Sequence, residues 1–354
     1  RTPSPTRPSS LEDLLPADLI ARLDRLDITS RKVLTGKLKG ERRSKKRGES
    51  VEFADHRPYV SGDDLRHIDW NIFGRLDRLF LKLFLEEEDL SLHLVIDASA
   101  SADTGEPSKF FLMQQLAMAL GYIGLVNYNR VAVTAIGGSL RLPPSPPRGE
   151  GRGEGKKAPP SPLGGEGRGE GKDSSSSSPS PQLLTRITDL RGKRRTHDLP
   201  RFLCNLEPGA GIGDTDAPDV PDFGEACKRI ALTRRGKGVM VLLSDMLIKE
   251  GYDTGLRLLV GRGYDLFVMQ VLSPQELDPS LAGDLRLKDL EDGDRADITI
   301  SAPLLKKYKQ NLAAYTTRLR EFCARRDITQ MTVRSDTPAD TLILDYLRRR
   351  GLVR

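Results

Sequence analysis

The chain has 354 residues, of which 37% are hydrophobic and 30% charged, and it contains 33 glycines and 23 prolines. This length predicts about two domains, and the apolar content excludes a wholly disordered chain. We expect neither a signal peptide nor a membrane span, because no charged-then-apolar segment opens the chain and no run approaches about 18 apolar residues. Three widely spaced cysteines exclude a disulfide framework and a cysteine-rich zinc site, and they favour a cytoplasmic location.

The first elements in chain order are a tail and a helix. Residues 1–10 contain three prolines and no large apolar side chain, so we expect a disordered tail. Apolar residues at helical spacing between Leu11 and Leu26 predict an N-terminal helix.

A basic segment follows, in which seven Lys and Arg residues between Lys37 and Arg47 surround the single acid Glu41. Its excess of positive charge equals the net charge of +6 of the whole chain, so the rest of the protein is balanced. The segment could bind the phosphates of nucleic acid or lipid, but it lacks aromatic residues for base stacking. A solvated loop, or a docking patch for an acidic partner, is the favoured interpretation, and we expect no nucleic-acid ligand.

Residues 48–90 are rich in strand-like and turn-like pieces and predict a small β-containing unit. From residue 90 onward, apolar runs of strand length alternate with helical patterns. We expect strands at 90–97, 130–136, 238–244, 264–272 and 328–333, a hairpin at 285–300, and helices at 109–128, 199–206, 223–233, 253–260, 303–326 and 338–349. This order predicts an α/β fold with a doubly wound, mainly parallel sheet.

Residues 143–182 differ in kind from their surroundings. Apart from proline, their apolar residues are Ala158 and Leu163, and they contain a Gly/Pro-rich direct repeat and a serine run. Such a composition cannot bury a core, so we expect a disordered, tolerated insertion. The predicted organisation is therefore a tail at 1–10, an N-terminal region at 11–89, and an α/β domain at 90–354 that the insertion interrupts.

An acid and two hydroxyls, Asp97, Ser99 and Ser101, follow the first buried strand at its carboxyl end. In parallel α/β sheets, ligands bind outside this end of the strands. Asp245 ends another predicted strand, and Thr215 follows a glycine-rich turn. Such oxygen ligands suit Mg²⁺. The alternative is that the two serines only cap the next helix.

A second motif, Gly-Asp-Asp-x-Arg-x-Ile-Asp-Trp, occupies residues 62–70. Shorter pieces accompany it: Glu52-Phe53, Arg57-Pro58-Tyr59 and Glu86-Glu87. Together with the Asp-x-Ser-x-Ser segment, they make the chain resemble the bacterial domain of unknown function 58 family over roughly residues 30 to 350. The core of that family resembles a von Willebrand factor type A domain, and its members are usually encoded beside a MoxR-type AAA+ ATPase.

The resemblance implies a metal-ion-dependent adhesion site. Its primary loop would be Asp97, Ser99 and Ser101, its second loop Thr215 and its third loop Asp245, holding Mg²⁺ or else Mn²⁺ or Ca²⁺. It further implies a non-enzymatic interaction module whose metal binds an Asp or Glu of a partner, such as the ATPase. The chain departs from the family at Ala102, where many members have Met, and in its longer glycine-rich loop.

The acids of the 62–70 block offer an enzymatic alternative. Asp63, Asp64 and Asp69 with His67 could form the metal site of a phosphoesterase. Against this, the block has no second histidine at ligand spacing and no evident general base. We favour a structural network in which Arg66 bridges acids and Trp70 anchors the block in the core.

Two other features carry no predicted chemistry. The histidines at 56, 93 and 197 lie in separate segments and form no pairing typical of nucleophilic catalysis. The glycine-rich turn at 209–213 lacks the lysine and hydroxyl that end a P-loop.

Overall fold

The computed structural model describes residues 8, 10–30, 52–61, 65, 68–85, 90–141, 184–209, 223–233, 238–249, 251–280, 283–288 and 295–354. Several expectations concern residues outside these ranges: most of the tail, the basic segment, the insertion, Thr215, and Asp63, Asp64, Arg66 and His67.

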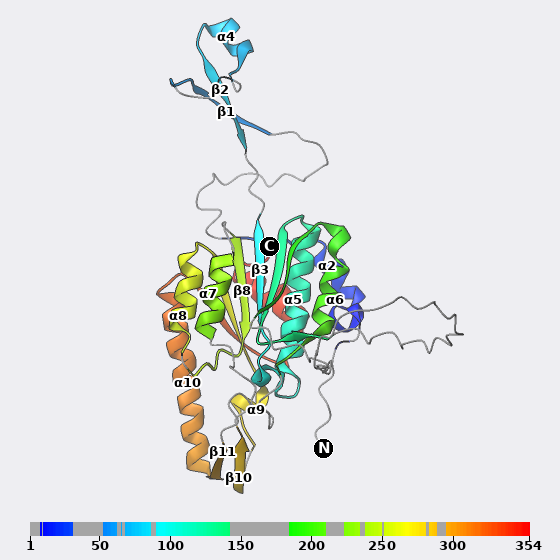
Figure 1. Ribbon diagram of the computed structural model, residues 1–354, viewed down its shortest axis with the longest axis vertical. Coiled ribbons are helices and arrows are strands. Elements are labelled where there is room, and N and C mark those ends of the chain that lie inside the picture. Colours follow the sequence, from blue (N-terminus) through cyan, green and yellow to red (C-terminus); the bar gives the residue numbers. More distant parts are fainter. Residues whose placement is uncertain are drawn as a thin grey trace, which may run out of the picture.

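A six-stranded sheet forms the centre of the protein, with the strand order β12-β9-β8-β3-β4-β6 (Figure 1). The strands are β3 (Ser91–Asp97), β4 (Arg130–Ile136), β6 (Leu184–Arg191), β8 (Gly238–Ser244), β9 (Asp265–Leu272) and β12 (Thr329–Arg334). All neighbouring pairs are parallel except β4 and β6, which are antiparallel. The expectation of an α/β protein with a mainly parallel sheet is confirmed. The edge strand β6 was not expected.

Helices cover both faces of this sheet, and each face has its own apolar core. One face carries α5 (Lys109–Val126), α6 (Asp198–Asn205) and the C-terminal turns α11 (Ala339–Thr341) and η4 (Leu342–Leu347). The other face carries α7 (Phe223–Thr233), α8 (Asp253–Gly261) and part of α10 (Ala302–Ala324). The strand interiors are apolar because both of their faces are covered.

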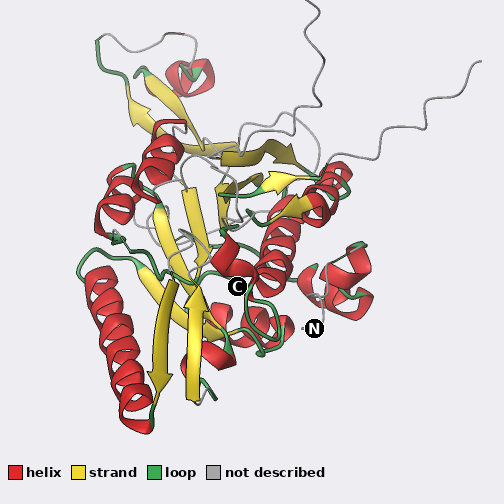
Figure 2. Cartoon of the chain, turned by 60° about the horizontal axis from the view of Figure 1, so that its bottom comes forward, coloured by secondary structure: helices red, strands yellow, loops and turns green. Residues whose placement is uncertain are grey.

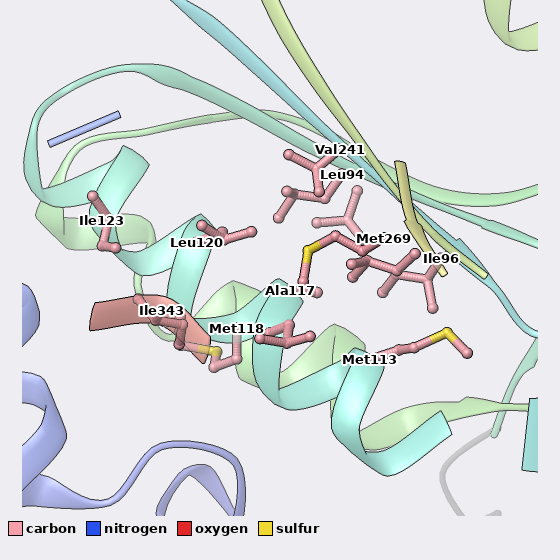
Figure 3. Packing of buried hydrophobic residues seen from close by; sticks show 14 of the residues in the cluster. Leu94, Ile96, Met113, Ala117, Met118, Leu120, Ile123, Val241, Met269 and Ile343 are labelled. Atoms are coloured by element: carbon pink, nitrogen blue, oxygen red, sulfur yellow. The ribbon is translucent and has the colours of Figure 1, made fainter. Parts of the chain in front are cut away.

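Helix α5 is apolar nearly all round because it lies between the sheet and other helices. Figure 3 shows Ala117 and Leu120 directed toward Leu94 and Val241 of the sheet, while Met118 meets Ile343 on the opposite side. By length and composition alone, α5 is long and apolar enough to cross a membrane. In this structure, 78% of the helix is buried within the protein.

The expected N-terminal helix is two helices, α1 (Leu11–Leu14) and α2 (Ala17–Leu23). Pro16 separates them because proline has no N–H to continue the hydrogen-bond pattern. Both helices pack their leucines into the core on the α5 side. Ile28 then pairs with Val353, which ties this segment to the C-terminus.

The described residues between 52 and 85 form a small unit, drawn apart from the six-stranded sheet in Figure 1. Strands β1 (Glu52–Pro58) and β2 (Phe80–Leu85) pair antiparallel, and α4 (Trp70–Leu76) lies between them in sequence. The expectation that Trp70 anchors this block in a core is wrong, because its side chain is 64% exposed. Its ring instead meets Phe73 edge-on along the same helix.

A second extension leaves the sheet near the end of β9. The short helix α9 (Pro274–Leu277) leads to the antiparallel hairpin of β10 (Gly283–Lys288) and β11 (Arg295–Ile300). The hairpin and the long helix α10 lie side by side beyond the body, at the bottom of Figures 1 and 2. The expected hairpin at 285–300 is confirmed, although its turn lies outside the described residues.

Candidate metal centre

Asp97 is the last residue of β3, in the middle of the sheet, and Ser244 ends the neighbouring strand β8. The Asp97 carboxylate accepts hydrogen bonds from the Ser244 hydroxyl at 2.6 Å and from the Ser99 backbone N–H at 3.0 Å. These two bonds fix the carboxylate at the carboxyl edge of the sheet, where a parallel α/β fold binds ligands.

The two serines of the loop do not cap the short 3₁₀ helix η2 (Ala100–Asp103) that follows. Ser99 occupies its N-cap position but makes no side-chain capping bond. The Ser99 and Ser101 hydroxyls lie 3.0 Å apart and hydrogen-bond each other. The next helix, α5, is capped by Ser108, whose hydroxyl accepts from the Phe111 N–H. The capping alternative for Ser99 and Ser101 is therefore wrong.

Asp245, directly after β8, belongs to the same cluster. One of its carboxylate oxygens, Oδ1, accepts from the Leu247 N–H at 3.0 Å. The other, Oδ2, lies 3.5 Å from the Ser101 hydroxyl, which donates to it. The structure thus brings together four of the five residues singled out in the sequence.

The fifth, Thr215, lies outside the described residues, but the start of its loop is described. The Gly209 N–H donates to the Ala98 carbonyl at 2.7 Å, beside Asp97. A Cβ at residue 209 would lie 2.4 Å from the Gly137 carbonyl, so only glycine permits this approach. The glycine-rich loop therefore departs from the edge of the candidate site.

Two charged residues of this site were not predicted from the sequence. Lys109, the first residue of α5, is fully buried, and its ammonium donates to Asp245 Oδ2 at 2.9 Å and to Glu276 Oε1 at 2.5 Å. Glu276 belongs to α9, where its other oxygen accepts from the Ser273 N–H in a capping box. The one available signal was a lysine at the start of an otherwise apolar helix.

The two aspartates of the cluster lie in different electrostatic environments. Burial raises the pKa of Asp97 above its ordinary value of 3.8, and the nearby charge of Asp245 raises it further, while the bonds from Ser244 and Ser99 oppose the change. Burial alone would lower the pKa of Lys109, but Asp245 and Glu276 raise it above the ordinary value, so the ammonium stays charged. Asp245 therefore has a cation beside it, whereas Asp97 is a half-buried acid held by the Ser244 hydroxyl and the Ser99 N–H.

These donors fit a hard cation. All of them are oxygens, two from carboxylates and two from hydroxyls, which is the donor type that Mg²⁺, Mn²⁺ and Ca²⁺ prefer. Among the described residues, no group of three or more His, Cys, Asp and Glu could hold a metal. A site here would accordingly depend on hydroxyl ligands and would be weakly charged.

The 62–70 block is described only in part, and there Asp69 has a structural role. Its carboxylate caps α4 by accepting from the N–H groups of Asn71 and Ile72. Its second oxygen lies 3.0 Å from His56 Nε2 on β1. Asp69 thus ties the helix to the hairpin.

Comparisons with known proteins support the family resemblance that the two sequence motifs indicated. The model of a family described as "Protein of unknown function DUF58" matches residues 55–153. The chain is 22% identical to "Uncharacterized protein Rv1480" of Mycobacterium tuberculosis and to "Uncharacterized protein Mb1516" of Mycobacterium bovis, over 99% of this chain and 97% of each relative. It is also 25% identical to "Uncharacterized protein MAV169" of Mycobacterium avium, over 48% of this chain and 96% of that relative.

Two solved structures align with this structure at low similarity. The conserved hypothetical protein BatB from Bacteroides thetaiotaomicron has a TM-score of 0.36 and 11% identity, over 73% of this chain and 98% of that one. An aerotolerance-related membrane protein from Bacteroides fragilis has a TM-score of 0.36 and 12% identity, over 73% and 99%. The family match is the informative result, since residues 55–153 include both the 62–70 block and the Asp97 loop, and over that segment the chain matches the DUF58 family.

Proposed function

We propose that the protein is a non-enzymatic, cytoplasmic interaction module that binds a partner protein through a divalent cation at the Asp97 loop. Asp97, Ser99, Ser101, Thr215 and Asp245 would hold Mg²⁺, or alternatively Mn²⁺ or Ca²⁺. A carboxylate of the partner would complete the coordination, so the ion acts as a bridge between two proteins.

One observation carries this proposal. The Ser99 and Ser101 hydroxyls bond to each other, and Ser101 also donates to Asp245 beside the half-buried Asp97. Ser99 makes no side-chain capping bond, although it occupies the N-cap position of η2. In a parallel α/β sheet, this edge is where ligands bind, and a few convergent polar side chains are typical of a binding site. The free cysteines Cys204, Cys227 and Cys323 are compatible with the cytoplasmic placement.

The proposed partner is a MoxR-type AAA+ ATPase, because the motifs of the chain resemble a family whose members are encoded beside such ATPases. A site with few negative charges binds a hard cation weakly, since affinity for these ions follows the number of charged ligands. A carboxylate from the partner would add the missing charge. The metal and the partner would then each strengthen the binding of the other by the same factor.

The phosphoesterase alternative has less support. It requires Asp69 as a free metal ligand, whereas the carboxylate of Asp69 caps α4 and pairs with His56. Nothing among the described residues of the 62–70 block favours hydrolysis over this structural role.

Calorimetric titration of Mg²⁺ and Mn²⁺ into the full chain tests the metal site. The wild type should bind one ion with an affinity weaker than about 10⁻⁴ M, in the range of weakly charged sites. Asp97→Ala should abolish binding while the protein remains folded. Asp278→Ala is a matched control, because Asp278 is an exposed acid beyond α9 that pairs with Lys309. Equal heats for the wild type and Asp97→Ala would contradict the proposal.

A further inference from the structure

The buried ammonium of Lys109 lies between two carboxylates that come from different parts of the chain. Asp245 follows β8, Glu276 belongs to α9, and Lys109 begins α5. Both contacts are short, at 2.9 Å and 2.5 Å, and the lysine side chain is fully buried. A buried cation is retained only where its charge is compensated by such partners.

One oxygen atom connects this ion pair to the candidate metal centre. Asp245 Oδ2 accepts from Lys109 Nζ and also from the Ser101 hydroxyl, whereas Oδ1 is held by the Leu247 N–H. A cation that approached Ser101 and Asp245 would therefore meet an oxygen already bonded to an ammonium.

The charges around this atom suggest why the lysine is there. When ionised, Asp97, Asp245 and Glu276 carry three negative charges, and Lys109 carries one positive charge. The remaining two negative charges match one divalent cation. Without Lys109, the metal-free protein would hold three neighbouring acids with no cation among these residues.

We infer that Lys109 is an internal counter-cation that competes with the divalent ion for Asp245 and thereby sets the metal affinity of the site. This inference rests on the proposed function. Glu276 allows this exchange, because the Lys109 ammonium stays paired with Glu276 when Asp245 binds a metal ion. Lys109 thus lowers the metal affinity of the free site.

The test compares metal affinities of full-chain variants by calorimetry. Lys109→Met retains the aliphatic chain without the charge, and it should bind Mn²⁺ about tenfold more tightly than the wild type, because a like charge a few ångströms away is removed. Glu276→Gln should weaken binding, because the ammonium then depends on Asp245 alone. Lys309→Met is the matched control, since it removes an exposed lysine that pairs with Asp278, and its affinity should not change.

Thermal unfolding gives a second readout. In EDTA, Lys109→Met should melt below the wild type, and saturating Mn²⁺ should restore more stability to the variant than to the wild type. If Lys109→Met fails to fold without metal, Glu276→Gln still provides the comparison of affinities.

The possible outcomes separate the two claims. Metal binding by the wild type with equal or weaker binding by Lys109→Met would overturn the role of Lys109 and leave the metal site standing. Binding by Lys109→Met but not by the wild type would support the competition. Binding by neither protein at millimolar Mn²⁺ would overturn both the inference and the proposed function.

Discussion

Asp97 is held in place by hydrogen bonds but is electrostatically unfavourable in the absence of a cation. Ser244 and the Ser99 N–H bind its carboxylate, and both interactions favour the ionised form. Burial and the charge of Asp245 nevertheless raise its pKa. This combination is typical of functional sites, where residues are positioned for a ligand at the expense of stability.

Asp97→Asn should therefore stabilise the metal-free protein. We expect the free energy of unfolding in EDTA at pH 8 to rise by about 1 kcal/mol, because the amide removes a partly desolvated charge next to Asp245. The measurement is urea denaturation of the wild type and the variant. Adding Mg²⁺ should reverse the order, since only the wild type gains stability from the ion.

The difference in free energy of unfolding between Asp97→Asn and the wild type should depend on pH in one direction. The folded protein holds the Asp97 proton more tightly than the unfolded chain does, because the pKa is raised on folding. Its contribution is thus most favourable below the ordinary pKa of 3.8 and is lost as the pH rises through the raised value. The advantage of Asp97→Asn should grow from acid to neutral pH, and an advantage that shrinks in that direction would contradict the assignment.

Among the elements, β3 and β8 determine where the two aspartates lie. Their parallel register pairs Ser91 with Gly238 at one end, and Asp97 and Asp245 emerge at the other. A Cβ at residue 238 would lie 2.2 Å from the Ser91 carbonyl oxygen, which belongs to the backbone and cannot turn aside. The close approach of Gly238 to Ser91, where the two strands begin, thus helps to align the ends at which the aspartates lie.

Gly238→Ala should destabilise the protein by about 1–3 kcal/mol, the usual range for forcing an atom into a well-packed core. It should also weaken metal binding, because the strand ends would shift relative to each other. Gly261→Ala, where a Cβ meets nothing within 4 Å, is the control and should change stability by less than about 0.5 kcal/mol. Equal urea midpoints for the two variants would count against this interpretation.

The sequence predicted the elements with strong periodicity, and it failed where tertiary context decides. The expected bounds of β4, α7 and β8 agree with the structure because long apolar patterns bounded by polar residues define them. Strand β6 escaped notice since an edge strand with one exposed face mixes apolar and charged residues. Trp70 looked like an anchor, yet its large ring lies on an exposed helix face.

The candidate site was predictable to the same limited extent. Asp97 and Asp245 were found because strand ends can be recognised in sequence, and parallel strands place them at one edge. Lys109 and Glu276 were missed, since the contacts of Lys109 to Asp245 and to Glu276 link residues more than a hundred positions apart. No local pattern reports such a contact.

At the scale of the whole molecule, the 143–182 segment should be dispensable for folding. It connects two parts of the structure that are already adjacent: β4 pairs with β6, and the Thr185 hydroxyl donates to the Gly138 carbonyl at 2.8 Å. Replacing residues 144–179 by a short Gly-Ser linker should leave the melting temperature nearly unchanged, because the entropy of closing a loop changes only slowly with its length. A large fall in melting temperature would show that the segment packs on the fold.

The central claim is that a metal ion bridges this protein to its partner, and the most direct test is partner affinity with and without metal. The full chain is titrated with the candidate MoxR-type ATPase in millimolar Mg²⁺ and in EDTA, with Asp97→Ala and Asp278→Ala in parallel. We predict that EDTA and Asp97→Ala each weaken the complex by about tenfold or more, within the usual range of coupling between two ligands, whereas Asp278→Ala behaves as the wild type. A partner that binds with the same affinity in EDTA as in Mg²⁺ would contradict the bridging mechanism.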